Sequence, residues 1–209
     1  ISPWVTPFSL SSKIIYYPYV STYSIIDVLK ALRENGVKVY ILSRCFDDFL
    51  SPDLIYILYT IYSKNLSIPR EIISYLKHKL EEIIHRLELS ESVIKIGVNF
   101  RTDFISDRWY RLHAKMYVNE KWAIIGSANF SRAGLVKGGN WECLLMVDSD
   151  NALYDKILEY AKRLFSIGID YDKCKERIVT IINSYLKDYV RINSFEHLKI
   201  MLKDLYHSL

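Results

Sequence analysis

Two side chains suited to phosphate chemistry, His113 and Lys115, lie two residues apart near the middle of the chain. The segment from Leu112 to Asn119 predicts a strand, and residues two apart on a strand project from the same face. An imidazole can attack phosphorus or transfer a proton, while a neighbouring ammonium group neutralises charge on the non-bridging oxygens. The pair therefore indicates an enzyme that acts on a phosphate ester.

Three further polar residues follow this pair along the chain. The tetrapeptide Gly126–Asn129 (GSAN) leaves a predicted strand, 121–125, in a glycine-assisted turn that presents a hydroxyl and a carboxamide as oxyanion donors. Glu142 lies on the next predicted strand, 141–147, where it can accept a hydrogen bond from an imidazole and fix its tautomer. We expect the catalytic residues to be His113, Lys115, Ser127, Asn129 and Glu142.

An H-x-K pair carries little information alone, and the chain contains a second one at residues 197–199. That pair lies in a helical pattern and no G-S-x-N follows it, so we expect a surface pair there. The first pair lies on a predicted strand and is followed by both G-S-x-N and N-x-E. The alternative for His113 is a strand histidine whose hydrogen bonds are satisfied in the core. His78 and His85, among Lys and Glu on a predicted helix, are expected to face solvent.

At these residues the chain resembles the phospholipase D superfamily, whose signature is H-x-K, four residues, an acid, and then G-S-x-N. The matching positions are His113, Lys115, Ser127 and Asn129, together with Glu142, which matches the glutamate of the family's small nucleases. Glu120 stands where the family usually has aspartate, a position that is commonly structural at the end of a strand. The likeness covers roughly residues 1–166 and implies the fold of that family for this part of the chain.

The resemblance implies an active site built from two H-x-K motifs that face each other across a pseudo-twofold axis. One histidine attacks phosphorus and forms a phosphohistidine, and the other protonates the leaving oxygen and then activates water. Because this chain has one credible motif, we expect a symmetric homodimer in which His113 of each subunit meets at the axis. Two close histidines titrate as a coupled pair, which leaves one neutral and one charged near neutral pH.

Basic residues gather around the motif. From Arg101 to Lys137 there are seven basic and three acidic residues, an excess of four that equals the net charge of the whole chain. This excess predicts a basic groove for a polyanion, with DNA expected ahead of RNA, and with aromatic rings to stack on bases or sugars. The expected substrate-binding residues are Arg108, Trp109, Arg111, Arg132 and Lys137. The alternative is that these charges form a solvated rim.

The first part of the chain follows the pattern of an α/β protein. Residues 13–20 predict a strand, the apolar spacing from Ile25 to Leu32 predicts a helix with Gly36 at its end, and residues 37–42 predict another strand. We therefore expect a mixed, largely parallel central sheet flanked by helices, as in phospholipase D-like proteins.

Two other segments are predicted to be helical. Residues 51–90 form a predicted helical insertion, and the chain after residue 172 carries two apolar stripes at helical spacing. We expect a catalytic domain over residues 1–168, which includes the insertion, and a C-terminal helical extension over residues 169–209.

The composition is that of a globular protein of ordinary size. The chain has 209 residues, of which 50% are hydrophobic and 25% charged, which excludes a disordered chain and a small disulfide scaffold. Its three cysteines form no CxxC pair and no zinc spacing, so we expect reduced thiols and a cytoplasmic protein. The longest apolar stretch, Leu54–Tyr62, is far shorter than the ~20 residues of a membrane helix, so no membrane partner is expected.

These observations together predict a metal-independent phosphodiesterase, in the first place a nuclease that cleaves DNA or RNA. No cofactor and no metal are expected, because the sequence lacks clustered carboxylates that could hold Mg²⁺, and Lys115 and Asn129 supply charge and hydrogen bonds instead. A phospholipase or phosphatidyltransferase is the first alternative. A non-catalytic nucleic-acid-binding or dimerisation module is the second.

Overall fold

The computed structural model describes residues 1, 9–11, 22–44, 70–103, 112–136, 139–186 and 191–209. The chain divides into two compact units: unit one comprises Ile1–Arg44 and Glu88–Asp170, and unit two comprises Cys45–Leu87 and Tyr171–Leu209. Most of the predicted insertion and nearly all of the predicted C-terminal extension thus belong to the same unit. The predicted strand at 13–20 and residues 51–69 of the insertion lie outside the described residues.

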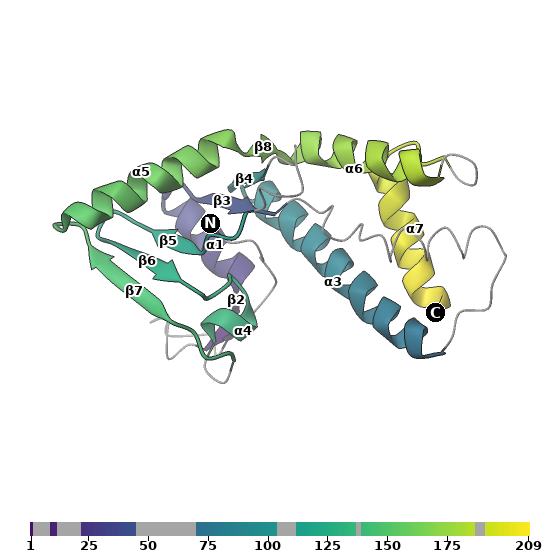
Figure 1. Ribbon diagram of the computed structural model, residues 1–209, viewed down its shortest axis with the longest axis horizontal. Coiled ribbons are helices and arrows are strands. Elements are labelled where there is room, and N and C mark those ends of the chain that lie inside the picture. Colours follow the sequence, from purple (N-terminus) through teal and green to yellow (C-terminus); the bar gives the residue numbers. More distant parts are fainter. Residues whose placement is uncertain (2–8, 12–21, 45–69, 104–111, 137–138, 187–190) are drawn as a thin grey trace. The chain divides into compact units, whose positions relative to one another are not determined.

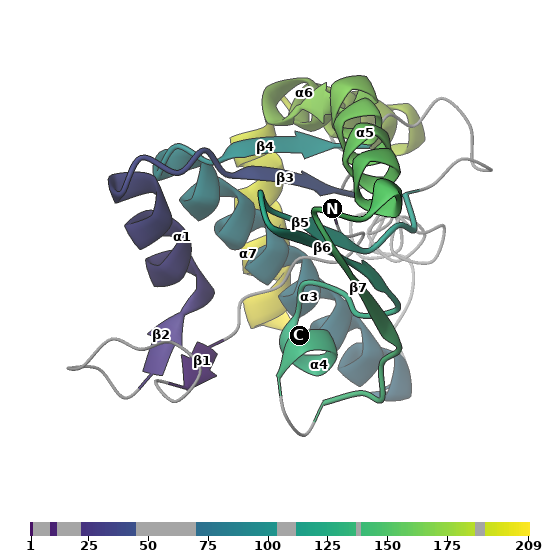
Figure 2. The same ribbon diagram turned by 90° about the vertical axis from the view of Figure 1, so that its left-hand side faces the viewer.

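The described residues of unit one form three small sheets (Figures 1 and 2). The first pairs β1 (Ser9–Ser11) with β2 (Thr22–Ser24) in antiparallel fashion. The second has the order β3 (Tyr40–Ser43), β4 (Asn99–Thr102) and β8 (Ile169–Asp170). The third is an antiparallel meander of β5 (Met116–Val118), β6 (Trp122–Gly126) and β7 (Leu144–Asp148).

The mixed α/β class and the C-terminal helices are confirmed, but the strand pairing is less parallel than the sequence analysis expects. In the described part of the chain, β3 and β4 alone pair in parallel. The reason in the third sheet is local. Asn119 Oδ1 accepts hydrogen bonds from the N–H groups of Lys121 and Trp122, both at 2.9 Å, and the tight turn that this closes can join only antiparallel neighbours.

Helix α1 (Ile25–Glu34) ends shortly before the predicted glycine, Gly36. At its start, Ser24 and Asp27 form a capping box in which each side chain accepts a hydrogen bond from the other's backbone N–H. At its end, Gly36 adopts φ +79° and its N–H donates to the carbonyl oxygen of Arg33 at 3.0 Å. This left-handed conformation favours glycine, and it turns the chain from α1 toward β3.

Helix α5 (Ala152–Ile167) packs on the third sheet and builds the core beside the candidate site (Figures 1 and 2). The buried residues of this core are Met116, Ala123, Val147, Tyr154 and Ile157. Burial of one large apolar side chain stabilises a fold by about 1.5–3 kcal/mol, so the cluster holds β5 firmly against α5. Because β5 directly follows His113 and Lys115, this core also fixes the position of that pair.

The described residues of unit two are helical, with loops between the helices. Helix α3 (Arg70–Lys95) begins in this unit and continues into unit one after Leu87, and α6 (Tyr171–Leu186) and α7 (Phe195–Ser208) follow later in the chain. The Ser194 side chain caps α7 by accepting from the His197 N–H, so the second H-x-K pair lies on a helix, as predicted. No described helix combines the length and the apolar character needed to cross a membrane.

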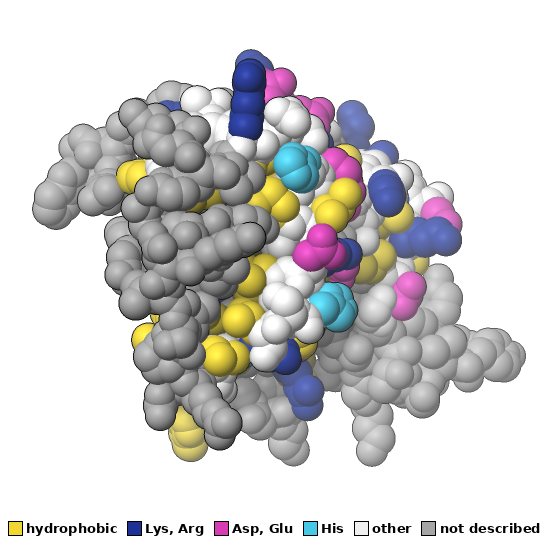
Figure 3. Space-filling view, turned by 90° about the vertical axis from the view of Figure 1, so that its right-hand side faces the viewer, with side chains coloured by type: hydrophobic (Ala, Val, Ile, Leu, Met, Phe, Trp, Pro, Cys, Tyr) yellow, Lys and Arg dark blue, Asp and Glu magenta, His cyan; other side chains and the backbone are white. Residues whose placement is uncertain are grey.

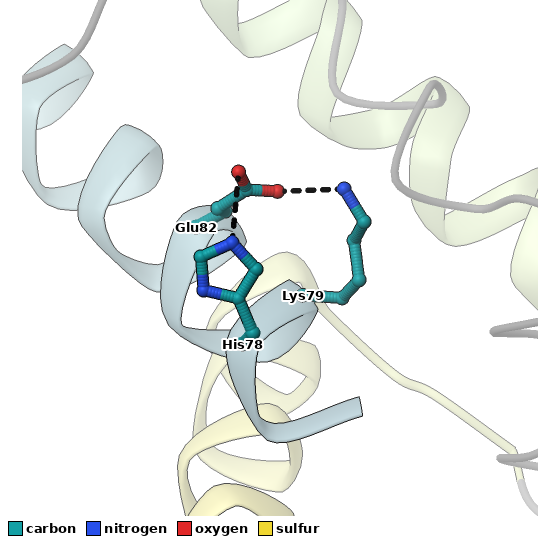
Figure 4. A network of polar contacts seen from close by, with 3 residues as sticks. All are labelled: His78, Lys79 and Glu82. Carbon is teal, nitrogen blue, oxygen red and sulfur yellow. Dashed lines mark hydrogen bonds and ion pairs between the residues drawn. The ribbon is translucent and has the colours of Figure 1, made fainter. Parts of the chain in front are cut away.

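The histidines of α3 are exposed, as predicted. His78 Nε2 lies 3.6 Å from the Glu82 carboxylate, and Lys79 Nζ lies 2.9 Å from the same carboxylate (Figure 4). Surface pairs of this kind contribute about 0–1 kcal/mol. The described part of the molecular face in Figure 3 carries acidic, basic and histidine side chains interspersed with hydrophobic ones.

The redox state of one cysteine differs from the expectation of reduced thiols. Cys174 is disulfide-bonded, so the expectation of reduced thiols is wrong for this residue. Wide spacing and an odd number of cysteines leave such a pairing invisible in the sequence. Cys143 is free and exposed, because it precedes β7 and takes no part in the core.

Candidate active site

The segment that carries His113 and Lys115 lies directly before β5 and is held by two side chains from the parallel strands. Arg44 Nε donates to the carbonyl oxygen of Leu112 at 2.7 Å, and the Leu112 N–H donates to Asp103 Oδ2 at 3.0 Å. Arg44 directly follows β3 and Asp103 directly follows β4, so the parallel pairing places both at one sheet edge. Neither residue is among the site residues predicted from the sequence. The one feature of the sequence that could have indicated them is that each is a charged residue directly after a strand.

His113 and Lys115 contact each other. Lys115 Nζ lies 3.0 Å from Nε2 and 3.3 Å from Nδ1 of His113, and it donates to the His113 carbonyl oxygen at 3.0 Å. Lys115 is 8% exposed, whereas His113 is an exposed residue. The ammonium group is therefore fixed in place, while the imidazole remains accessible to a substrate.

The surroundings of the pair lower both pKa values. The ammonium group of Lys115 is the main cause that lowers the pKa of His113 below its ordinary 6.5, and burial and the Arg44 guanidinium act in the same direction. Burial is the main cause that lowers the pKa of Lys115, with Arg44 adding to the effect and Glu142 opposing it. An imidazole with a lowered pKa is neutral, and hence nucleophilic, at a lower pH than a free histidine.

Replacing Lys115 with methionine is expected to raise the pKa of His113, because the substitution removes the charge that chiefly lowers it. The acid limb of any reaction that needs neutral His113 would then move to higher pH. NMR titration of the imidazole protons measures the pKa directly, and Lys121→Met on the exposed turn after β5 is the control. An unchanged or lower pKa in Lys115→Met would show that the ammonium group does not control the imidazole.

Ser127 connects the end of β6 to Glu142. Its hydroxyl donates to Glu142 Oε2 and accepts from the Cys143 N–H at 2.9 Å. Glycine is required at position 126, because a Cβ there would clash with the Cys143 carbonyl oxygen. In this geometry the Ser127 hydroxyl positions the Glu142 carboxylate, whose charge partly opposes the lowering of the Lys115 pKa. These contacts differ from the predicted ones, in which Ser127 donates to an oxyanion and Glu142 accepts from an imidazole.

The side-chain amide oxygen of Asn129 accepts no hydrogen bond in the described part of the chain. This Oδ1 atom is buried, although an unpaired buried polar group costs about 1–3 kcal/mol. The backbone around it is fixed, because Asn129 O accepts from the Ser131 N–H at 2.8 Å and a Cβ at Gly134 would clash with the Asn129 backbone. A fixed amide of this kind can receive a hydrogen bond from a ligand or an ordered water.

A cavity of about 400 Å³ lies beside the pair, within unit one. Its lining residues are His113, Ala114, Lys115, Met116, Ile125, Gly126, Lys156, Ile157 and Tyr160. Its volume falls in the range of small-molecule sites. Of the five predicted catalytic residues, His113 and Lys115 line this cavity. Ser127 and Asn129 follow the lining residue Gly126 in the sequence, and Glu142 accepts a hydrogen bond from Ser127.

Only one of the predicted substrate-binding residues is described. Arg132 is exposed at the start of α4 (Arg132–Leu135), and it does not line the cavity. The other four, Arg108, Trp109, Arg111 and Lys137, lie outside the described residues. Within the described ranges, no group of three or more His, Cys, Asp or Glu side chains could hold a metal ion.

Known proteins are similar to this chain over most of its length. The model of a family described as "Cardiolipin synthase, PLD-like domain" matches residues 9–165, which include all five predicted catalytic residues. Among solved structures, the chain is similar to Nuc from Salmonella typhimurium, a phospholipase D family member, with 20% identity and a TM-score of 0.43 over 70% of this chain and 72% of that chain. A search of curated proteins gave no match.

Proposed function

Because the chain belongs to the family of PLD-like domains, we propose that it is a metal-independent phosphodiesterase and, more specifically, a nuclease. One observation carries the proposal. The accessible imidazole of His113, whose pKa is lowered, lies 3.0 Å from the buried ammonium group of Lys115 beside a cavity. A neutral nucleophile next to a fixed positive charge is what attack on a phosphodiester needs.

The reaction proceeds in two displacements. In the first, a ring nitrogen of neutral His113 attacks phosphorus, the N–P bond forms, and the P–O bond to the leaving group breaks as a second, protonated imidazole gives its proton to the leaving oxygen. In the second, water attacks phosphorus, the second imidazole takes its proton, and the N–P bond breaks to restore neutral His113. Lys115 balances the charge on the non-bridging oxygens in both steps.

We assign the second imidazole to His113 of a second copy of the chain. Leu144 and Met146 point to one side of β7 and are 46% and 61% exposed, and Trp141, just before the strand, is fully exposed. In the described sheet β7 is an edge strand, and an exposed apolar edge favours association with another chain. Because Glu142 lies between Trp141 and Leu144 of this surface, a twofold axis there would bring two candidate sites together.

Phosphatidyl transfer is the second candidate, since the matching family is described by the name cardiolipin synthase. The same two displacements would serve, with an alcohol in place of water in the second. The apolar part of the cavity, Met116, Ile125 and Ile157, suits a lipid as well as a base. Salt separates the two candidates, because binding of a nucleic acid weakens steeply as salt rises.

The test is an assay of the purified chain in EDTA on labelled single-stranded DNA, duplex DNA, RNA and a phosphatidylcholine analogue. We expect a nucleic acid to be cleaved at a rate that the chelator does not reduce. Loss of activity on chelation would contradict the metal-independent mechanism. Turnover of the lipid alone would favour phosphatidyl chemistry, and no turnover of any substrate would favour a non-catalytic module.

A further inference from the structure

The cavity beside His113 has a second wall, formed by one face of α5. Lys156 and Tyr160 lie one helical turn apart on this helix, and both line the cavity together with Ile157. Residues four apart on a helix are neighbours on its surface, so the amine and the phenol ring are adjacent on α5, and both border the cavity that His113 and Lys115 also line. Neither residue belongs to the signature that the sequence analysis identifies.

Both side chains are available to a ligand. Lys156 is exposed and Tyr160 is 53% exposed. In the described part of the chain, neither makes an ion pair or a side-chain hydrogen bond. The core holds their helix through Tyr154 and Ile157, which are buried on the sheet side of α5. The pair is therefore presented by a rigid element rather than by a loop.

An amine next to an aromatic ring matches one nucleotide of a single strand. The ammonium group can neutralise a phosphate that neighbours the reacting one, and the ring can stack on an unpaired base. A cavity of about 400 Å³ has room for a group of nucleotide size. The apolar residues Met116, Ile125 and Ile157 would then contact the face of the base or the sugar.

We propose that Lys156 and Tyr160 form a subsite for the nucleotide adjacent to the scissile phosphate of a single-stranded nucleic acid. The proposal rests on the function proposed above and specifies its substrate class. Lys156 binds the neighbouring phosphate, and Tyr160 stacks on the base. The single strand is preferred because its bases are already free to enter the cavity.

Binding of a fluorescent single-stranded oligonucleotide tests the subsite, with His113→Ala present in every chain to prevent cleavage. We expect Lys156→Ala to weaken binding about fivefold and to reduce the slope of log affinity against log salt by about 0.7. Tyr160→Ala should weaken binding about tenfold, and Tyr160→Phe should retain it, because stacking needs the ring and not the hydroxyl. A duplex of the same sequence should bind more weakly than the single strand.

Two matched controls separate the subsite from general effects of charge and surface. Lys162→Ala removes the same charge from an exposed position of α5 that does not line the cavity, and Tyr185→Ala removes a tyrosine that is 52% exposed in unit two. Neither should change the affinity. Equal losses in the control and the test variants would overturn the subsite, as would equal binding of duplex and single strand.

The remaining outcomes distinguish this inference from the proposed function. If the chain with native His113 cleaves single strands but Lys156→Ala and Tyr160→Ala bind as tightly as their parent, the subsite is wrong and the nuclease stands. If the two variants lose affinity as expected but no nucleic acid is cleaved, the nuclease is wrong and the binding site stands. If they lose binding to phosphatidylcholine–cardiolipin vesicles instead of the oligonucleotide, the subsite serves a lipid and the inference is overturned.

Discussion

Replacing His113 with alanine is expected to reduce cleavage of the best substrate by about 10⁴-fold or more, because the substitution removes the nucleophile of the first displacement and, in the second copy of the chain, the proposed general acid and base. The side chain is exposed, so the free energy of unfolding should change by less than about 0.5 kcal/mol. Steady-state kinetics and thermal unfolding of the same preparation measure the two quantities. A large loss of rate without a loss of stability is the signature of a catalytic residue.

The chain supplies its own matched control for this experiment. His197 also belongs to an H-x-K sequence, but it lies on α7 in unit two, where its backbone N–H donates to Ser194 Oγ. His197→Ala should leave the rate unchanged. Cleavage that survives His113→Ala would exclude this imidazole as the nucleophile, and an equal loss in both variants would indicate an effect on folding rather than on chemistry.

Introducing positive charge by substitution on the exposed side of β7 is expected to separate the subunits of the proposed dimer. It should reduce activity by at least about 100-fold at low protein concentration. The change is the double substitution Leu144→Lys and Met146→Lys, at positions 46% and 61% exposed. Like charges facing each other across a twofold axis disfavour the dimer, and a lone subunit lacks the second imidazole. Sedimentation velocity gives the oligomeric state, and activity is measured at the same concentrations.

The control for this prediction is Ile167→Lys, which adds a charge at the end of α5 at a position 63% exposed. It should affect neither association nor rate. Full activity of a monomeric Leu144→Lys, Met146→Lys variant would contradict a shared site. A native chain that is active as a monomer would contradict it equally.

Local sequence signals predicted the parts of this molecule that local interactions determine. The conformation of Gly36 follows from its place after an apolar helical stripe. The contact of Lys115 with His113 follows from their spacing in an extended segment. The turn after β6 follows from the glycine of GSAN, since only glycine leaves room for the Cys143 carbonyl.

The parts that the sequence did not predict depend on contacts between residues distant in the chain. Arg44 reaches Leu112 across 68 positions, and no spacing rule connects the two. In the sequence, the positions of Lys156 and Tyr160 are typical of the solvated side of an amphipathic helix. In the structure, both residues line the cavity beside His113. The expectation of a largely parallel sheet failed for a related reason. A hydrophobic pattern identifies strands, but the turn at Asn119 decides that β5 and β6 pair in antiparallel fashion.

The stereochemical course at phosphorus tests the two-displacement mechanism most directly. Cleavage of a phosphorothioate diester of one configuration in ¹⁸O-labelled water yields a chiral thiophosphate whose configuration can be determined. Each in-line displacement inverts phosphorus, so attack by His113 followed by attack by water predicts overall retention. Overall inversion would mean that water attacks the diester directly, and would contradict the covalent role of His113.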